Sequence, residues 1–521
     1  MGPLLARDTV EDLFDRYGPG YRWFVTIGGL TASFTMVLTG TIVNVAVPDV
    51  MGAYGVGQDK AQFLSTAFIT TMTASQLLNA WFVGKFGQRD AFIIVLSIFL
   101  LGGLICGFSP NLNVIIFGRV MQGFAAGIVQ PLVMVTLFQV FPADRRGTAM
   151  AIYGMGLVLA LGLGPVVGGV TIDVLGWRNI FFVPLPLVVI ALTAGIFLMP
   201  SALNQRKTGA FDWYGYVLLC IALYCMMSAI GHGQRDGWTS DRSMTVILIG
   251  LTATIGFVIS QLRPGSSMLD FSLFKNVRFA SAVVVAIVFG MGNFASTYAI
   301  PVFGQLVQGY TATVAGFLML PASLFVVMVL PITGRLTDRV PPQYPIMGGL
   351  LVFAFGSLLL ASADINTSFW TFAFYTVIAR FGMSFITPAL MSTALGSLPP
   401  DRLNQGSGTI NFFRQLGGAT GINSLVVVLE MRTQFHSDAY TVTQTASNSS
   451  TRELLSNLES VLTGSGIPAS QASQIAIGHL GRMVEAQANT MGFQDGFLVT
   501  GVVFILALIP AYILARAAPN K

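Results

Sequence analysis

The chain has 521 residues, of which 54% are hydrophobic and only 9% charged, and its formal net charge is +5 at pH 7. Soluble domains carry about a quarter charged residues, so this composition excludes a soluble globular protein and indicates an integral membrane protein. The basic residues lie in short loops between apolar runs and not along one face. The positive charge therefore reflects the membrane topology and does not indicate binding to nucleic acid.

Cysteine and histidine usage excludes several kinds of site. The three cysteines lie in apolar runs and predict no disulfide framework, and the three histidines have no companions at metal-ligand spacing: Cys106, Cys220, Cys225, His232, His436 and His479. The sequence contains neither a nucleophile elbow nor a phosphate-cradling glycine loop. We therefore predict no metal, no cofactor, no enzymatic activity and no ATPase on this chain.

The first 22 residues mix acidic and apolar side chains without the hydrophobic core of a signal peptide. Asp8, Glu11, Asp12 and Asp15 alternate with apolar residues at helical spacing. This pattern is typical of an amphipathic helix at a membrane surface. We expect residues 1–22 to form a cytoplasmic amphipathic N-terminus.

Fourteen apolar runs follow, each close to the 20 or so residues that a helix needs to cross a bilayer. They are 23–47, 62–82, 91–109, 112–138, 148–172, 179–199, 212–232, 243–262, 279–302, 312–333, 345–363, 368–396, 406–430 and 493–516. The predicted fold class is all-α integral membrane, and the even number of spans places both termini on one side.

Lysine and arginine predict the orientation, because cytoplasmic loops carry an excess of them. Of the 27, seventeen fall on the side of the termini, seven on the other side, and three within spans. We therefore predict a plasma membrane (cell inner membrane) protein with both termini cytoplasmic. The longest polar insertion, about 431–492, is then extracytoplasmic. Its apolar spacing predicts a helical hairpin that packs on itself, and a docking surface for a partner is the alternative.

The fourth and fifth spans carry an unusual stretch. Arg119 and Gln122 stand beside Gly123 where hydrocarbon is expected, and an ionised side chain there marks a protein interior or a water-filled cavity. The fifth span has small residues that let a helix approach closely and a proline that permits a bend: Gly164, Pro165, Gly168 and Gly169. A tightly packed bundle with one paired, buried arginine is the alternative to a polar pathway.

This stretch recurs at an offset of 257 residues. Pro131, Pro142, Asp144, Arg145 and Gly164 correspond to Pro388, Pro399, Asp401, Arg402 and Gly421. Duplicated halves with a site between them are how many transporters are built, so the repeat predicts two related bundles.

Several motifs in order along the chain carry a family resemblance. They are Thr41-Ile-Val-Asn44-Val-Ala-Val-Pro48, Arg119-x-x-Gln122-Gly123, Gly164-Pro165-x-x-Gly168-Gly169, Trp177-Arg178, Phe211-Asp212-x-x-Gly215, Leu273-Phe274, Tyr310-x-Ala312-x-x-Ala315-Gly316, Gly334-x-Leu336-x-Asp338-Arg339 and Arg414-Gln415-Leu416-Gly417-Gly418. Over nearly its whole length the chain resembles the major facilitator superfamily, and within it the fourteen-helix drug:proton antiporters of the EmrB/QacA type.

The resemblance implies a rocker-switch carrier with two six-helix bundles, at 23–199 and 279–521, the second including the hairpin. The linker at 200–278 would hold two extra helices. The resemblance also ties the Arg119 helix to proton coupling and the glycine-proline helix to export. The loop with Asp338 and Arg339 would latch the cytoplasmic side, by bonding to a helix end or to charges on another helix in one state and releasing in the other.

The chain departs from the family pattern in two places. The first-half loop Gly84-Lys85-Phe86-Gly87-Gln88-Arg89 has no acid where Asp338 stands in the second copy, so the latch is expected to be asymmetric. Relatives usually carry an aspartate in the first helix where this chain has Thr39 or its neighbour. No span has Asp or Glu near its middle, which leaves the peripheral Asp49 and Asp495 as candidate proton carriers.

The charges embedded in the spans are Arg119, Arg380 and Arg414, all positive. A cavity lined by them would disfavour cations and suit anionic or zwitterionic amphiphiles. In the alternative, Arg119 and Arg414 are neutralised by helix C-termini or backbone carbonyls and say nothing about the cargo. Further polar residues within spans are expected to line the cavity: Asn44, Gln130, Tyr153, Asn293 and Asn411.

Three functions follow as hypotheses. The first is a secondary-active exporter of drugs or other small amphiphilic compounds, working by alternating access and coupled to protons. The second is an exporter or exchanger dedicated to one anionic metabolite or lipid-like acid. The third, which the missing aspartate alone supports, is a transport-inactive membrane sensor or scaffold. The lipid bilayer is an expected partner, and a periplasmic adaptor with an outer-membrane channel is compatible with the hairpin.

Overall fold

The computed structural model describes residues 8–56, 63–201, 211–263, 268–445 and 447–516, and no strand occurs within these ranges. The first half contains α1 (Val10–Tyr17), α2 (Tyr21–Ile42), α3 (Val47–Tyr54), α5 (Phe63–Ser75), α6 (Asn79–Phe86), α7 (Gln88–Gly107), α8 (Leu112–Val140), α9 (Arg146–Leu175) and α10 (Leu185–Leu198). The rest contains α11 (Trp213–Asp236), α12 (Asp241–Gln261), α13 (Val277–Leu306), α14 (Ala312–Phe317), α15 (Leu320–Arg339), α16 (Gln343–Ala361), α17 (Phe369–Gly396), α18 (Leu403–Thr443), α19 (Ser449–Gly464), α20 (Ala469–Leu506) and α21 (Leu508–Arg516). The predicted all-α fold is confirmed.

Thirteen helical segments of the described residues are long and apolar enough to cross a membrane. The predicted span at 62–82 is not among them, although its residues are helical. It is broken into α5, the 3-10 turn η4 (Gln76–Leu78) and α6, and it is rich in buried polar side chains, among them Thr73, Ser75 and Gln76. A helix this polar is stable in a membrane only where protein surrounds it.

The repeat at an offset of 257 residues is present in the secondary structure. α8 and α17 begin at Leu112 and Phe369, and the following helices α9 and α18 begin at Arg146 and Leu403, each after a 3-10 turn. The residues before α8 and α17, Asn111 and Ser368, are both N-caps whose side chains accept a backbone N–H three residues on. The matched prolines, Pro131 and Pro388, both lie inside their helices.

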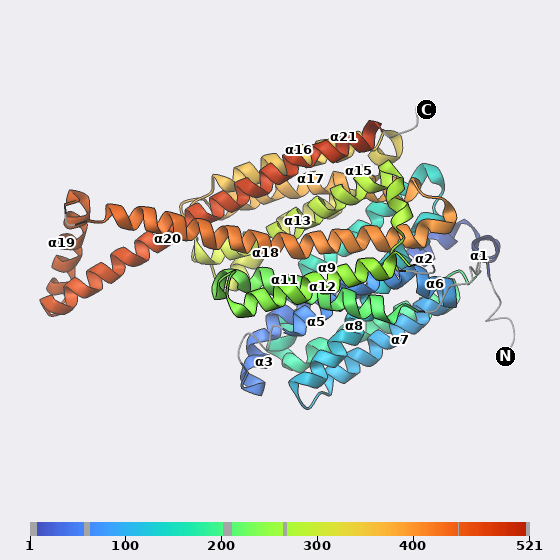
Figure 1. The fold of residues 1–521 in the computed structure, drawn as a ribbon, viewed down its shortest axis with the longest axis horizontal. Coiled ribbons are helices and arrows are strands. Elements are labelled where there is room, and N and C mark those ends of the chain that lie inside the picture. Colours follow the sequence, from blue (N-terminus) through green and yellow to red (C-terminus); the bar gives the residue numbers. More distant parts are fainter. Residues whose placement is uncertain (1–7, 57–62, 202–210, 264–267, 446, 517–521) are drawn as a thin grey trace.

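The bundle has two distinct ends (Figure 1). α1 and the last turn of α21 lie at one end, here called the α1 end, and α19 lies beyond the other, here called the hairpin end. α18 is a single helix of 41 residues, roughly 60 Å long at 1.5 Å per residue, about twice the thickness of a hydrocarbon core. α18 and α20 therefore run past the bundle without a break at 431 or 492, and α19 packs against α20 at the tip.

The two inserted helices, α11 and α12, pack mainly on each other. α11 also contacts α5 of the first half and α18 of the second. The hydroxyl groups of Tyr216 in α11 and Ser75 in α5 lie 3.0 Å apart. The inserted pair thus stands beside both halves without separating them.

Candidate functional site

The two halves meet at the α1 end through α9 and α15. The carboxylate of Asp338 in α15 accepts the backbone N–H groups of Gly147 at 2.6 Å and Thr148 at 3.0 Å, and the Thr148 hydroxyl at 2.6 Å. These donors belong to the first turn of α9, where the helix dipole favours a negative charge. Arg339 is exposed beside this contact. Of the two partners expected for Asp338, a helix end or charges on another helix, the structure shows the helix end, and its release in another state stays a prediction.

Close packing of glycines surrounds this contact. A Cβ at Gly147 would lie 2.7 Å from a carboxylate oxygen of Asp338, and one at Gly334 would lie 2.6 Å from the Cβ of Ala151. Neither distance is tolerated by real Cβ atoms. The glycines allow α9 and α15 to approach closely enough for the Asp338 bonds to form.

A second contact between the halves joins α6 and η4 to α18. The Nδ2 of Asn79 donates to the carbonyl of Asn404 at 3.2 Å and to the hydroxyl of Ser407 at 3.4 Å. Gly408 lies against the carbonyl of Gln76, with no room for a Cβ between them. The sequence analysis missed the role of Asn79 and Gly408. The run of small residues around Gly408 was the only signal, and such runs are common in membrane helices.

The two turns that correspond at the 257-residue offset hold charged residues that contact nearby groups. Asp144 and Arg145 are largely exposed and lie 3.9 Å apart. In the second copy, Arg402 reaches Asp270 at 3.8 Å and the Ser272 hydroxyl at 2.7 Å, which ties the turn to the segment preceding α13. Asp401 is exposed in that turn.

Arg119 is fully enclosed within the first half. Its Nε donates to the carbonyl of Leu64 at 3.0 Å, and its Nη1 to the carbonyl of Thr39 at 3.3 Å and to Oε1 of Gln122 at 3.0 Å. The guanidinium also stands 4.2 Å from the ring centroid of Phe68. These neutral partners match the alternative in which backbone carbonyls solvate the arginine. With no exposed surface, Arg119 does not reach a cavity in this conformation.

Arg414, in contrast, lies where the halves face each other. Its Nη2 donates to Oδ1 of Asn411 at 2.9 Å, and Nδ2 of Asn411 approaches the sulfur of Met134 in α8 at 3.1 Å. Across the interface, the Tyr153 hydroxyl of α9 donates to the carbonyl of Gln130 at 3.3 Å. All these polar side chains are buried. The structure thus brings together four of the residues predicted to line a cavity.

Arg380 belongs to the second half. Its Nη1 donates to Oδ1 of Asn293 and its Nη2 to the Thr297 hydroxyl of α13, both at 2.6 Å. The side chain is only half-buried. Within the described residues none of the three embedded arginines forms an ion pair.

The candidate proton carriers lie at the hairpin end. Asp49 is exposed at the start of α3. Asp495 of α20 accepts from Nε of Arg432 at 2.6 Å and lies 2.8 Å from Nε2 of His436, both in α18. Thr39 is buried, and its hydroxyl donates to the Thr35 carbonyl. Asn44 was predicted to line the cavity, but its side chain is outside the described residues.

The predicted small-residue positions differ in their surroundings. Gly123 lies against the backbone carbonyl of Phe68, and Gly164 against the side chain of Thr41, so neither site has room for a Cβ. Gly168 is buried, whereas a Cβ at Gly169 would meet nothing within 4 Å. The side chain of Pro165 is outside the described residues.

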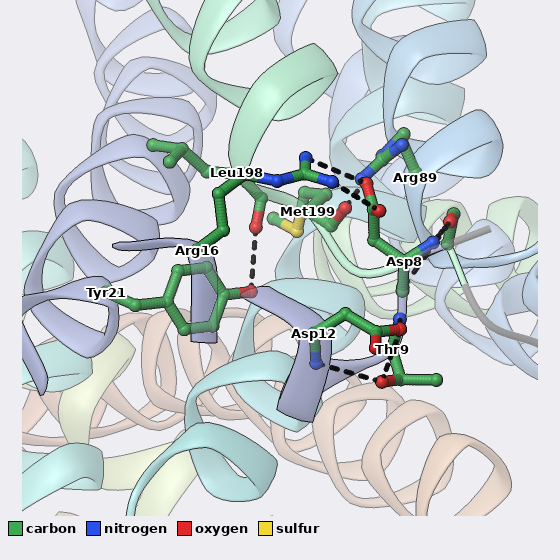
Figure 2. Close-up of polar contacts among 9 residues, drawn as sticks. Asp8, Thr9, Asp12, Arg16, Tyr21, Arg89, Leu198 and Met199 are labelled. Carbon is green, nitrogen blue, oxygen red and sulfur yellow. Dashed lines mark hydrogen bonds and ion pairs between the residues drawn. The ribbon is translucent and has the colours of Figure 1, made fainter. Parts of the chain in front are cut away.

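The N-terminal segment supplies an acid to the first-half loop (Figure 2). The carboxylate of Asp8 pairs with Arg89 at 2.8 Å and with Arg16 at 3.0 Å. Arg89 also donates to the carbonyl of Met199 at 2.8 Å, and the Asp8 N–H donates to the Ser201 hydroxyl at 2.6 Å. The hydrogen bond from Arg89 holds the pKa of Asp8 below its ordinary value. The expected asymmetry of the two loops is therefore real: Arg89 is satisfied within its own half, and Asp338 bonds across the halves.

The N-terminus was expected to lie on the membrane surface as an amphipathic helix. The helix forms as α1, opened by a capping box between Thr9 and Asp12. Its Leu13 is fully buried, so one face packs on the bundle.

A small apolar cavity of about 60 Å³ lies within the second half, among α13, α18 and α20. Met291, Leu425 and Phe504 are among its lining residues, and none of the embedded arginines lines it. It therefore adds nothing to the polar layer around Arg414.

Comparisons with known proteins agree with this architecture. A family model described as Major Facilitator Superfamily matches residues 29–422. The uncharacterized MFS-type transporter YhcA of Bacillus subtilis (strain 168) is 28% identical over 489 residues, covering 94% of this chain and 92% of that protein. The multidrug export protein EmrB of Escherichia coli (strain K12) is 26% identical over 486 residues, covering 93% of each.

Two solved structures share the fold. The human organic anion transporter MFSD10 (TETRAN) superposes with a TM-score of 0.60 at 14% identity, covering 95% of this chain and 99% of that one. A double Trp mutant of XylE gives a TM-score of 0.61 at 13% identity, covering 96% and 97%. At this identity the likeness concerns the fold alone.

Proposed function

Because this chain belongs to the major facilitator superfamily, whose members are transporters and not enzymes, we propose that it exports drugs or other amphiphilic compounds by alternating access, coupled to protons. It is a multi-pass membrane protein, and several relatives are named as multidrug transporters. The export direction, the coupling ion and the mechanism are the parts that we propose.

The observation that carries the proposal is the contact of Asp338 with the first turn of α9. It joins the halves through one carboxylate and three donors, and the carboxylate is half-buried. Polar contacts of this kind exchange readily with water, so they can form and break as two rigid bodies rock. The second contact, of Asn79 with Asn404 and Ser407, is also polar and lies at the same end. This arrangement supports a gate at the α1 end.

We further propose that the α1 end faces the cytoplasm and that the protein lies in the inner membrane. The excess of lysine and arginine in the loops of that end supports this orientation. The hairpin of α18, α19 and α20 then projects on the extracytoplasmic side. An adaptor and an outer-membrane channel docking there remain a prediction.

Proton coupling needs an acid that can change its protonation state. In the proposal Asp495 carries this role, because it shares its carboxylate with Arg432 and His436, and histidine is the side chain that titrates near neutral pH. Asp49, which is exposed and has no ion pair within the described residues, is the second candidate. Asp495→Asn should abolish stimulation by a pH gradient while the protein stays folded.

The experiment is ethidium transport by the full-length protein in proteoliposomes with an imposed pH gradient. We expect gradient-dependent movement of ethidium that falls in Asp338→Asn and loses its pH dependence in Asp495→Asn. Transport at a rate that does not depend on the pH gradient would refute proton coupling. Failure to move ethidium, cholate or any other amphiphile of a test panel would overturn the proposal in favour of a transport-inactive sensor or scaffold.

A further inference from the structure

The wall that the second half presents to the first carries buried donors without acceptors. Within the described residues, Nη2 of Arg414 donates a hydrogen bond to Asn411, and the buried Nε has no partner. Both Nη groups of Arg380 donate to side chains of α13, and its buried Nε likewise has no partner. Buried donors of charged groups are normally paired, and an unpaired one requires an explanation such as water or a ligand.

Both arginines stand directly beyond the contacts that close the α1 end. On α18, Gly408 lies against the Gln76 carbonyl and Asn411 reaches Met134, and Arg414 follows one turn further toward the hairpin end. On α17, Thr387 lies against Gly154 of α9. Arg380 lies two turns from Thr387 toward the hairpin end, on the same face of the helix.

α13 connects the two positions. Its Gly290 packs against the backbone carbonyl of Arg414, and its Asn293, one turn further, binds Arg380. The backbone at Arg414 and the side chain of Arg380 therefore meet the same short segment of α13. Within the described residues their hydrogen-bond partners are neutral: Asn411, Asn293 and Thr297.

Arg119 does not belong to this wall. Its guanidinium is fully buried in the first half, where Nε and Nη1 donate to two carbonyls and the Gln122 oxygen, while Nη2 has no partner within the described residues. These bonds hold the side chain inside the first half, where it has no exposed surface. Of the three embedded arginines, Arg414 and Arg380 are therefore the two that belong to this wall.

We propose that this wall binds the acidic group of the substrate, and that the protein's preferred cargo is an amphiphile bearing a carboxylate. Arg414 is the primary ligand, since it has the most unused donors, and Arg380 is a second cation held in place by Asn293 and Thr297. A carboxylate supplies acceptors to a guanidinium in a charge-assisted pair, which a cation or a neutral amphiphile cannot do. The inference rests on the proposed transport function and names its substrate class.

The test compares one amphiphile in charged and neutral form. Binding of radiolabelled cholate and of its methyl ester, below the micellar concentration of cholate, is measured with the full-length protein in nanodiscs. We expect the ester to bind at least about tenfold more weakly, which is the loss of one charge-assisted bond. Equal binding of the two compounds would overturn the proposal without the use of any variant.

Variants locate the site. Arg414→Gln should weaken cholate binding about 10- to 100-fold and leave ester binding within about twofold, and Arg414→Lys should restore part of the affinity. Arg380→Gln should also weaken cholate binding, by a smaller factor. The control is Arg482→Gln, which removes the same charge from an exposed position of the hairpin and should change neither compound. Cholate binding that is equal in the Arg414→Gln and control variants would overturn the assignment.

The ethidium assay separates this inference from the function on which it rests. If the wild-type protein moves ethidium along a pH gradient but does not distinguish cholate from its ester, transport stands and the carboxylate preference falls. If cholate binds as expected but nothing is transported, the site stands and the export function falls.

Discussion

Replacing Asp338 with asparagine should open the α1 end. The carboxylate accepts three hydrogen bonds from Gly147 and Thr148, whereas asparagine has one acceptor oxygen and no charge to oppose the helix dipole. Hydrogen bonds to charged groups contribute about 1.5–3 kcal/mol each. Because the carboxylate is half-buried, solvent reduces this contribution, and we expect the conformation closed at this end to lose about 1–3 kcal/mol. That energy corresponds to a shift of roughly 5- to 150-fold in the equilibrium between conformations.

The assay is a distance measurement between spin labels in nanodiscs, on a background without the three native cysteines. Labels at Gln139 and Tyr344 report on the separation of the halves, since both residues are exposed at the α1 end of α8 and α16. We expect a longer distance to gain population in Asp338→Asn. The matched control is Asp173→Asn, at the exposed opposite end of α9. An unchanged distance distribution in Asp338→Asn, or the same change in the control, would refute this account of the latch.

Three further predictions follow from the same contacts. Gly334→Ala places a Cβ 2.6 Å from that of Ala151 and should lengthen the label distance, whereas Gly169→Ala, with nothing within 4 Å, should not. Arg119→Ala removes a fully buried side chain and should cost about 2–4 kcal/mol in a thermal unfolding assay in detergent; an unchanged midpoint with lost transport would instead place Arg119 on the transport path. Because its pairing lowers the pKa of Asp8, the carboxylate stabilises the fold above the ordinary aspartate pKa of about 4 and loses this effect as the pH falls below it. Asp8→Asn should therefore lower the unfolding midpoint at pH 7, and the difference from the wild type should be smaller at pH 3; an equal difference at both values would contradict the pairing.

The sequence by itself determined the class and the plan of this protein. Apolar runs long enough to span a bilayer predicted the helices, because backbone groups in lipid must bond within their own segment. The repeat at 257 residues predicted two related bundles, because matched prolines and turn residues act locally on the backbone. The family resemblance of the loop with Asp338 led us to expect a bond to a helix end or to charges on another helix.

Only the tertiary structure decided which charges are available between the halves. Arg119 and Arg414 look alike in sequence, yet one is solvated by carbonyls of α2 and α5 and the other faces the opposite half. Arg89 finds its acid in Asp8, 81 residues away, and Gly408 meets Gln76 across the interface. Such pairs depend on how helices pack, and composition and periodicity describe each helix alone. The surroundings of an arginine within a span are therefore a property of the assembled bundle.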